Sequence, residues 1–264
     1  MRFHEWRSQL HGQLFAVIDA ALDQTLVARF YETGGEDAYP LFAGTAFADQ
    51  AEQGPWLLPS PSSNFIDSDP QLCGFYVVSS ASSETVRKHW QSLIEVAREG
   101  EVMWFRYADN RILSKMLDAM SQRDLDDILG PCAGLWVNES GWRRSDGADF
   151  IPRYAPWFRI QPHHLAPLYD ENRHAYILRR RLWQTMTAMM ERHPDPEGTI
   201  LPVLKQANQD GLQEDVRDGV VAGALALQAK TPLEEIRVPL MLADDELAQV
   251  VNWLNKRNEL TGVC

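Results

Sequence analysis

The amino-acid sequence predicts an α/β fold class: an N-terminal sheet lobe flanked by helices, followed by an all-helical C-terminal lobe. Short apolar runs alternate with amphipathic stretches through the first half of the chain, as expected of a sheet covered by helices. After the segment "RYAPWFRIQPHH" no strong strand pattern recurs, and long segments with helical periodicity take over. We therefore expect an α/β domain over residues 1–155 and a helical lobe over residues 156–264.

The first lobe carries several strand signals. One strand is expected over residues 14–18, where β-branched side chains favour a pleated surface and Asp19 follows directly. Two more are expected in "GFYVVSS" and "EVMWFRY", and "GLWVNESGWRR" is either one strand or a short hairpin around Ser140 and Gly141. The segments "YPLFAGT" and "GPWLLPSPSSNF" carry Pro, Gly and Ser at turn positions, so an irregular edge or a loop is expected there.

Helical periodicity fills the remaining segments. Residues 82–100 predict one helix, because apolar side chains recur at helical spacing, Ser82 or Ser83 can cap its start and Gly100 ends it. The recurring positions are Val86, Trp90, Ile94 and Ala97. "RILSKMLDAM" predicts the next helix. The C-terminal lobe carries three apolar helical faces, formed by Leu178, Leu182, Met186 and Met189; by Val216, Val220, Ala224 and Leu227; and by Leu247, Val250, Val251 and Leu254.

Charge and composition narrow the classes of partner. The chain has 37 acidic and 25 basic residues and a formal net charge of −12, which repels phosphate backbones and anionic lipids. We therefore expect no nucleic-acid partner. The start, "MRFHEWRSQL", has no apolar signal region, and no apolar run is long enough to span a bilayer, so we expect no membrane insertion and a cytoplasmic location. Cys73, Cys132 and Cys264 are widely separated, which favours reduced, structural thiols.

The segment "FRYADNRIL" places two arginines and an aspartate beside an expected strand. Arg106 points to the opposite face from its neighbours in the strand, and a partly buried guanidinium needs a carboxylate nearby. Asp109 and Asp19 are the available acids; Asp109 can also cap the following helix, whose first turn contains Arg111. We interpret Asp19, Arg106, Asp109 and Arg111 as a structural charge network, with catalysis or partner binding as alternatives.

Sequence motifs for chemistry are lacking. His163, His164 and His174 do not have the spacing of a metal site, and a solvated or core histidine is the expected state of each. The segment "GTAFADQAEQG" lacks the glycine spacing of a dinucleotide-binding loop, and nothing matches a phosphate-binding loop or a nucleophile elbow. We expect no catalytic residue, no metal and no cofactor.

The helical lobe carries a candidate partner-binding stretch. Arg179, Arg180 and Arg181 put positive charge on a helix of an acidic protein, and this stripe could dock an acidic peptide or domain. Trp183 follows, and the methionines of "MTAMM", Met186 and Met190 among them, suit a groove that accepts varied helices. The alternatives are a solvated charged face and methionines that fill the core.

An ordered series of motifs resembles a known family. The series is "LFAVIDAAL", "YPLFAGT", "GPWLLP", "GFYVVSSASSETVRKHWQSLI" and "MWFRYADNRILSKML", within residues 14–137. A strand that ends in aspartate, a Leu-Phe-x-Gly-Thr turn, Gly-Pro before an aromatic residue and leucine, and a final Phe-Arg-x-x-Asp-x-Arg resemble the effector-adaptor chaperones of the bacterial type VI secretion system. Two positions depart from the pattern: Trp56 replaces an expected tyrosine, and Trp90 stands where leucine is commoner.

The resemblance implies a cytoplasmic adaptor without enzymatic activity. Such a protein binds a toxin effector and promotes its loading onto the spike protein, so the implied partners are a toxin effector protein and a spike protein of the secretion apparatus. It also makes the helical lobe a candidate for cargo recognition. The alternatives are a hydrolase of unrecognised type that uses Asp19 or Asp109, and an immunity protein that neutralises a toxin, for which the acidic charge would suit a basic nuclease domain.

Overall fold

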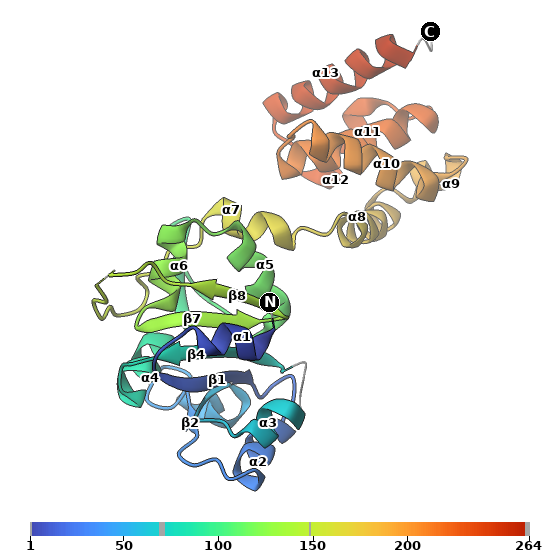
Figure 1. Cartoon of the computed structure of the whole chain (residues 1–264). Coiled ribbons are helices and arrows are strands. Elements are labelled where there is room, and N and C mark those ends of the chain that lie inside the picture. Colours follow the sequence, from blue (N-terminus) through green and yellow to red (C-terminus); the bar gives the residue numbers. More distant parts are fainter. Residues whose placement is uncertain (1, 69–71, 148, 262–264) are drawn as a thin grey trace. The chain divides into compact units, whose positions relative to one another are not determined.

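The computed structural model of the chain describes residues 2–68, 72–147 and 149–261 and divides into two compact units, Met1–Tyr169 and Asp170–Cys264 (Figure 1). The sequence-based boundary after residue 155 lies too early, because Phe158 and Ile160 are buried in the core of the first unit. The segment of Phe158 and Ile160 has no strand pattern, so the sequence places it in the helical lobe. Its apolar side chains nevertheless pack into the core of the first unit. Cys264 lies outside the described residues.

The first unit is built on a six-stranded antiparallel sheet with the strand order β2-β3-β1-β4-β7-β8. The strands are β1 (Gln13–Asp19), β2 (Tyr39–Pro40), β3 (Pro55–Pro59), β4 (Gly74–Ser79), β7 (Cys132–Val137) and β8 (Ser140–Arg143). The predicted sheet lobe with flanking helices and the helical region after it are confirmed. The purely antiparallel pairing is a feature that periodicity alone did not determine.

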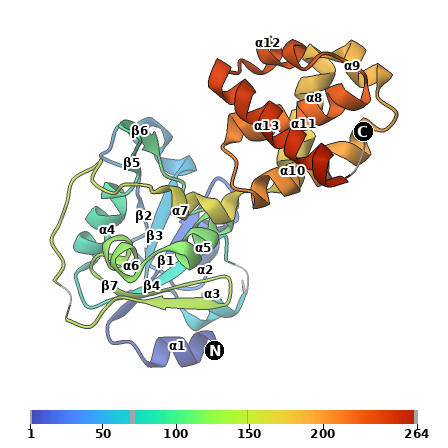
Figure 2. The same ribbon diagram turned by 90° about the horizontal axis from the view of Figure 1, so that it is seen from above.

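Both faces of the sheet are covered by helices (Figures 1 and 2). Along β1, Phe15 and Val17 enter one core, whereas Ala16 and Ile18 enter the other, because successive side chains of a strand point to opposite faces. The first core includes side chains from α4 (Ser83–Ser92), α5 (Asn110–Ala119) and α6 (Gln122–Leu129). The second includes side chains from α1 (Phe3–Ser8), α2 (Thr25–Glu32) and α3 (Ser63–Ser68).

The helix expected over residues 82–100 is wrong in its second half. Helix α4 ends at Ser92, and a two-stranded hairpin follows, made of β5 (Glu95–Arg98) and β6 (Glu101–Trp104). Its turn consists of Glu99 and Gly100, whose φ angles of +52° and +89° suit a two-residue hairpin turn. Gly100 therefore ends a strand, not a helix, and β6 belongs to this hairpin and not to the main sheet.

Three smaller differences from the sequence prediction concern β3, α6 and the turn between β7 and β8. Strand β3 forms in a segment expected to be irregular, since its prolines stand at the two ends and leave an apolar centre free to pair. Helix α6 was not predicted; Ser121 and Asp124 form a capping box at its start. Of the two alternatives for residues 134–144, the structure has the hairpin, formed by β7 and β8, but it turns at Asn138 and Glu139, both with positive φ, and not at Ser140 and Gly141.

The second unit is entirely helical among its described residues. Its helices are α8 (Glu171–Thr185), α9 (Thr187–Arg192), α10 (Pro196–Gln209), α11 (Glu214–Gln228), α12 (Arg237–Leu240) and α13 (Asp244–Thr261). Helix α11 packs against α10 and α13, and α10 packs against α8 (Figure 2). The predicted apolar faces contribute most of their residues to this core, but Leu227 is exposed and Val251 is only half-buried and lies outside the core.

Short helical turns complete the two units. They are α7 (Pro162–Leu165), η1 (Ala48–Gln53) and η2 (Ala166–Leu168) in the first unit and η3 (Leu233–Ile236) in the second. In the part of the chain that the structure describes, no helix has both the length and the apolar character needed to cross a membrane.

A close approach of β4 to β1 makes Gly74 a test of the sheet. A Cβ at Gly74, where φ is +151°, would lie 2.0 Å from the carbonyl oxygen of Val17. We expect Gly74→Ala to lower the free energy of unfolding by about 3 kcal/mol, from backbone strain together with the clash. Gly34→Ala is the control: it also has positive φ, but no atom lies within 4 Å of the added Cβ, so it should cost about 1 kcal/mol. Equal losses in urea denaturation would contradict this account.

Candidate functional site

Asp109 is the centre of the predicted charge network. It caps α5, and its Oδ1 accepts the backbone N–H of Arg111 at 3.1 Å. The guanidinium of Arg111 donates to both carboxylate oxygens, from Nε to Oδ1 at 2.9 Å and from Nη2 to Oδ2 at 2.8 Å. Arg106 adds a bond from Nη2 to Oδ2 at 3.2 Å. Both oxygens of Asp109 are therefore held by arginines.

Burial in this cluster is uneven. The side chain of Asp109 is 2% exposed, whereas those of Arg106 and Arg111 are 42% and 66% exposed. The hydrogen bond from the Arg111 side chain is the main reason that the pKa of Asp109 lies below its ordinary value of 3.8. Such a carboxylate stays ionised and occupied, which favours fastening over proton transfer.

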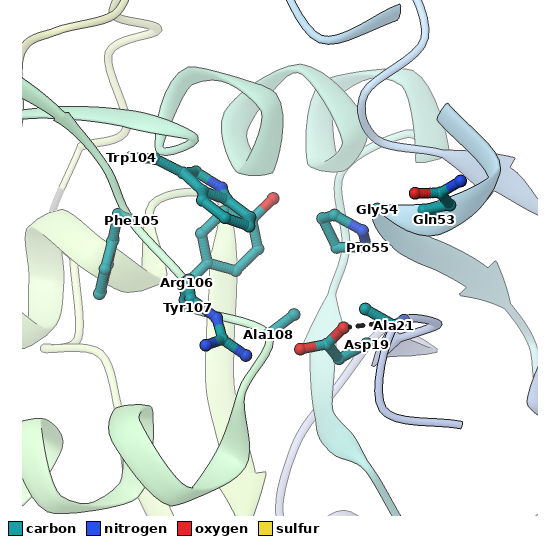
Figure 3. A pocket seen from close by; sticks show the side chains of 10 residues that line it. All are labelled: Asp19, Ala21, Gln53, Gly54, Pro55, Trp104, Phe105, Arg106, Tyr107 and Ala108. Carbon is teal, nitrogen blue, oxygen red and sulfur yellow. Dashed lines mark hydrogen bonds between the residues drawn. The ribbon is translucent and has the colours of Figure 1, made fainter. Parts of the chain in front are cut away.

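Asp19 stands apart from this ion pair although it lies nearby. It ends β1, is largely buried, and its Oδ1 accepts the N–H of Ala21 at 3.0 Å. Burial raises its pKa, and the charge of Arg106 opposes that rise. Figure 3 shows the guanidinium of Arg106 and the carboxylate of Asp19 directed toward one another. Asp109, Arg106 and Arg111 are thus joined by hydrogen bonds, whereas Asp19 interacts with Arg106 electrostatically.

A small cavity separates Asp19 from the hairpin. It measures about 40 Å³, and its lining includes Pro55, Trp104 and Tyr107 (Figure 3). This volume is large enough for a few water molecules. The buried hydroxyl of Tyr107 has no hydrogen-bond partner in the described structure. Asp19 therefore borders a small, mostly apolar space.

The segment from Trp104 to Asp109 joins the hairpin to α5. Phe105 and Tyr107 are buried, and the N–H of Phe105 donates to the carbonyl of Ile94 at 2.8 Å. Trp104 is exposed and lies 6.0 Å from the guanidinium of Arg106, a cation–π distance. The alternation of burial predicted for this segment is confirmed, but the strand itself ends at Trp104.

His163 and His164, each expected to be a solvated or core histidine, lie beside an acid that the sequence analysis missed; His163 is exposed and His164 is buried. Asp124, His163 and His164 place ligand atoms within 4.8 Å of one another, and Oδ2 of Asp124 lies 3.4 Å from Nε2 of each histidine. However, Nδ1 of His164 accepts the backbone N–H of Gln161 at 3.1 Å, so the proton of a neutral ring resides on Nε2. That proton occupies the position that a metal would need, and Nε2 of His164 makes no hydrogen bond of good geometry in the described structure.

The cluster therefore fits a structural role, in which the histidines hold the Asp124 that caps α6. The pKa of Asp124 is lowered to about 2: hydrogen bonds from Ser121 and the histidines outweigh desolvation, which is the largest single effect and opposes them. No spacing rule finds this group, because Asp124 lies far from the histidines in the sequence. His174 bonds instead to Asp218, at 2.7 Å.

The candidate partner-binding residues of the helical unit fall into two groups. Met186 and Met190 are buried in its core, so they offer no surface to a partner. Arg179 pairs with Glu197, and Arg181 donates to the carbonyl of Pro239 and lies 3.8 Å from Asp218. Arg180 and Trp183 are exposed.

Exposed aromatic and aliphatic side chains that the sequence analysis missed extend this surface. Tyr176 and Ile177 are exposed on α8, one helical turn before Arg180 and two turns before Trp183. These four residues form what we call the α8 face, opposite the buried positions of the helix. The sequence could have indicated this face, because at helical spacing these four residues lie on the side of α8 opposite Leu178 and Leu182.

The comparisons with known proteins concern the first unit. Residues 14–127 match the model of one family, described as "Domain of unknown function (DUF4123)". The matched residues run from β1 into α6 and include the whole charge network. They cover less than half of the chain, and the helical unit lies outside them. No curated protein and no solved structure matches the chain.

The two acids of the network should respond oppositely to removal of their charge. The pKa of Asp109 is lowered, so its ionised form stabilises the fold above the ordinary value of 3.8, and this contribution is lost as the pH falls through the folded-state pKa. We expect Asp109→Asn to lower the free energy of unfolding at pH 7 by about 1–2 kcal/mol, because both arginines reach water that screens the pair. The loss should disappear in strong acid.

The pKa of Asp19 is raised, so its contribution is present below the unfolded-state pKa and is lost as the pH rises through the folded-state pKa. Asp19→Asn keeps an acceptor for the N–H of Ala21 and removes the buried charge. We expect it to be at least as stable as the unaltered protein at pH 7. Urea denaturation of both variants checks the pair of signs, and a larger loss for Asp19→Asn than for Asp109→Asn would reject this assignment.

Proposed function

We propose that this chain is a cytoplasmic adaptor that binds a toxin effector of a bacterial type VI secretion system and promotes loading of that effector onto the spike protein. The observation that carries the proposal is the match of residues 14–127 to DUF4123 over the same region that contains the ordered motifs resembling effector adaptors. The net charge of −12 supports protein partners over nucleic acid.

The charge network supports a function that works through surfaces. Asp109 has both oxygens engaged by arginines, and Asp19 borders a cavity of about 40 Å³. The engaged oxygens of Asp109 support a structural role for this acid over a catalytic one. An adaptor needs a stable platform and exposed groups that another polypeptide can cover, and the bonds of Asp109 contribute to the platform.

The α8 face supplies one such surface. Tyr176 and Trp183 are aromatic, Ile177 is aliphatic, and Arg180 forms no ion pair within 4.0 Å among the described residues. Aromatic residues and arginine dominate the binding energy of protein interfaces, and a positive charge beside apolar side chains suits an amphipathic segment that carries acids. We assign effector recognition to this face.

Affinity purification of the full-length chain from the cytoplasm of its own cells tests the function. We expect a toxin effector and a spike subunit to be recovered with it. Recovery of the chain alone, together with hydrolytic activity, would contradict the adaptor function. Binding to an isolated toxic domain with rescue from its toxicity would instead identify an immunity protein.

The double variant Arg180→Glu, Trp183→Ala tests the α8 face. Because both side chains are exposed, we expect unchanged thermal stability and a loss of at least about tenfold in effector affinity, as for the central residues of an interface. Val238→Ala is the matched control, since Val238 is an exposed apolar residue on α12, and it should leave binding unchanged. Full effector binding by the double variant would exclude this face.

A further inference from the structure

The hairpin of the first unit has one covered edge and one free edge. The pairs in its register are Glu95 with Trp104, Val96 with Met103, Ala97 with Val102 and Arg98 with Glu101. In a hairpin with a two-residue turn, the pair that closes the turn exchanges both hydrogen bonds, and hydrogen-bonded pairs then alternate with non-bonded ones. Val102 and Trp104 are in the non-bonded pairs, so their N–H and C=O groups point away from β5.

Strand β5 gives an independent check on this assignment. Ala97, the partner of Val102, donates its N–H to the carbonyl of Phe158 and accepts the N–H of Ile160, both at 2.9 Å. Its backbone groups therefore point away from β6, as a non-bonded pair requires. The outer edge of β5 is thus covered by residues 158–160, whereas the described residues provide no backbone partner for Val102 or Trp104 on the outer edge of β6.

The side chains of β6 do nothing to protect this edge. Val102 and Trp104 are 57% and 54% exposed, and Met103 is also exposed. Proteins usually block a free edge with lysine, proline or a bulge, but Glu101 at the turn is the one charged residue of β6. Four unpaired backbone groups beside exposed apolar side chains form a template for another strand.

Aromatic residues from a distant segment, the buried Phe42 and the half-buried Phe47, support Trp104 at one end of β6. The ring centroid of Trp104 lies 6.1 Å from that of Phe42 and 6.5 Å from that of Phe47. Buried Phe105 and the Asp109 cluster hold the residues that follow, so the edge is presented by a braced segment. Addition of a strand here would therefore cost the hairpin little conformational freedom.

We propose that the outer edge of β6 binds an extended segment of a partner protein by addition of one strand, and that this segment carries alternating apolar and basic side chains. The charge of the hairpin favours a basic segment: Glu95, Glu99 and Glu101 outnumber Arg98, and Arg98 lies 3.5 Å from Glu99. Arg106, just beyond β6, is already paired with Asp109. Two copies of the chain, each with a net charge of −12, repel one another, which disfavours self-association at this edge.

This inference names a second contact surface of the proposed adaptor and rests on that function for the identity of the partner. The edge itself can be tested without the partner. Val102→Pro removes an outward N–H and leaves the hydrogen bonds between β5 and β6 intact, because Val102 belongs to a non-bonded pair. Val102→Ala is the matched control, since it shortens the side chain but keeps the N–H.

The probe is a display library of random peptides, selected on the immobilised full-length chain. We expect the selected peptides to alternate apolar and basic residues. Their affinity for the Val102→Ala variant should lie within about threefold of that for the unaltered chain. Their affinity for Val102→Pro should be lower by at least about tenfold, the effect of about one lost hydrogen bond. Bound peptide should also slow hydrogen exchange at the amides of Val102 and Trp104. The melting temperature of Val102→Pro should match that of Val102→Ala.

Three outcomes would overturn the inference. Selected peptides could bind Val102→Pro as tightly as the unaltered chain, the selection could yield no peptide that slows exchange at Val102 and Trp104, or sedimentation could show a dimer that Val102→Pro abolishes. The adaptor function is judged separately. If Val102→Pro recovers toxin and spike from cells as the unaltered chain does, the edge is not part of loading; if the unaltered chain recovers neither, the function itself fails.

Discussion

Burial of the Asp109 carboxylate is the constraint on which the architecture of the first unit around the hairpin depends. A carboxylate that is 2% exposed must be compensated, and Arg111, Arg106 and a backbone N–H at the start of α5 supply the compensation. These bonds fix the chain between the end of β6 and the first turn of α5. On its β6 side, the hairpin is consequently attached to the helical layer through a short segment whose two aromatic side chains, Phe105 and Tyr107, are buried.

The two neighbouring acids illustrate how environment assigns their roles. Asp109 is surrounded by donors that lower its pKa, whereas burial raises the pKa of Asp19. In an enzyme, such a difference between two carboxyl groups would suggest an acid and a base. Here Asp19 borders a cavity of about 40 Å³, whereas both carboxylate oxygens of Asp109 accept hydrogen bonds from Arg111, and these bonds hold the start of α5 in place. In the proposed adaptor, the exposed groups on β6 and on α8 are the surfaces that contact other polypeptides.

The sequence could predict those features that depend on neighbouring residues. Strand β1, strand β4, helix α5 and the pairing of Asp109 with its arginines follow from local periodicity, capping and the cost of a buried charge. The hairpin could not be predicted in this way, because Ile94 and Ala97 continue the helical spacing of α4, and only the turn at Glu99 and Gly100 decides against it. The approach of Asp124 to the histidine pair is a tertiary contact without a spacing rule. The burial of Met186 was one of two readings that helical spacing alone left open.

The central claim is that Asp109 braces the hairpin as well as capping α5. Hydrogen exchange of the backbone amides in the full-length chain, compared between the unaltered protein and Asp109→Ala, tests it most directly. We expect faster exchange in the first turn of α5 and also in β5 and β6, with β1 and β4 unchanged. Faster exchange that is confined to α5 would contradict the claim, since Asp109 would then be a helix cap and nothing more.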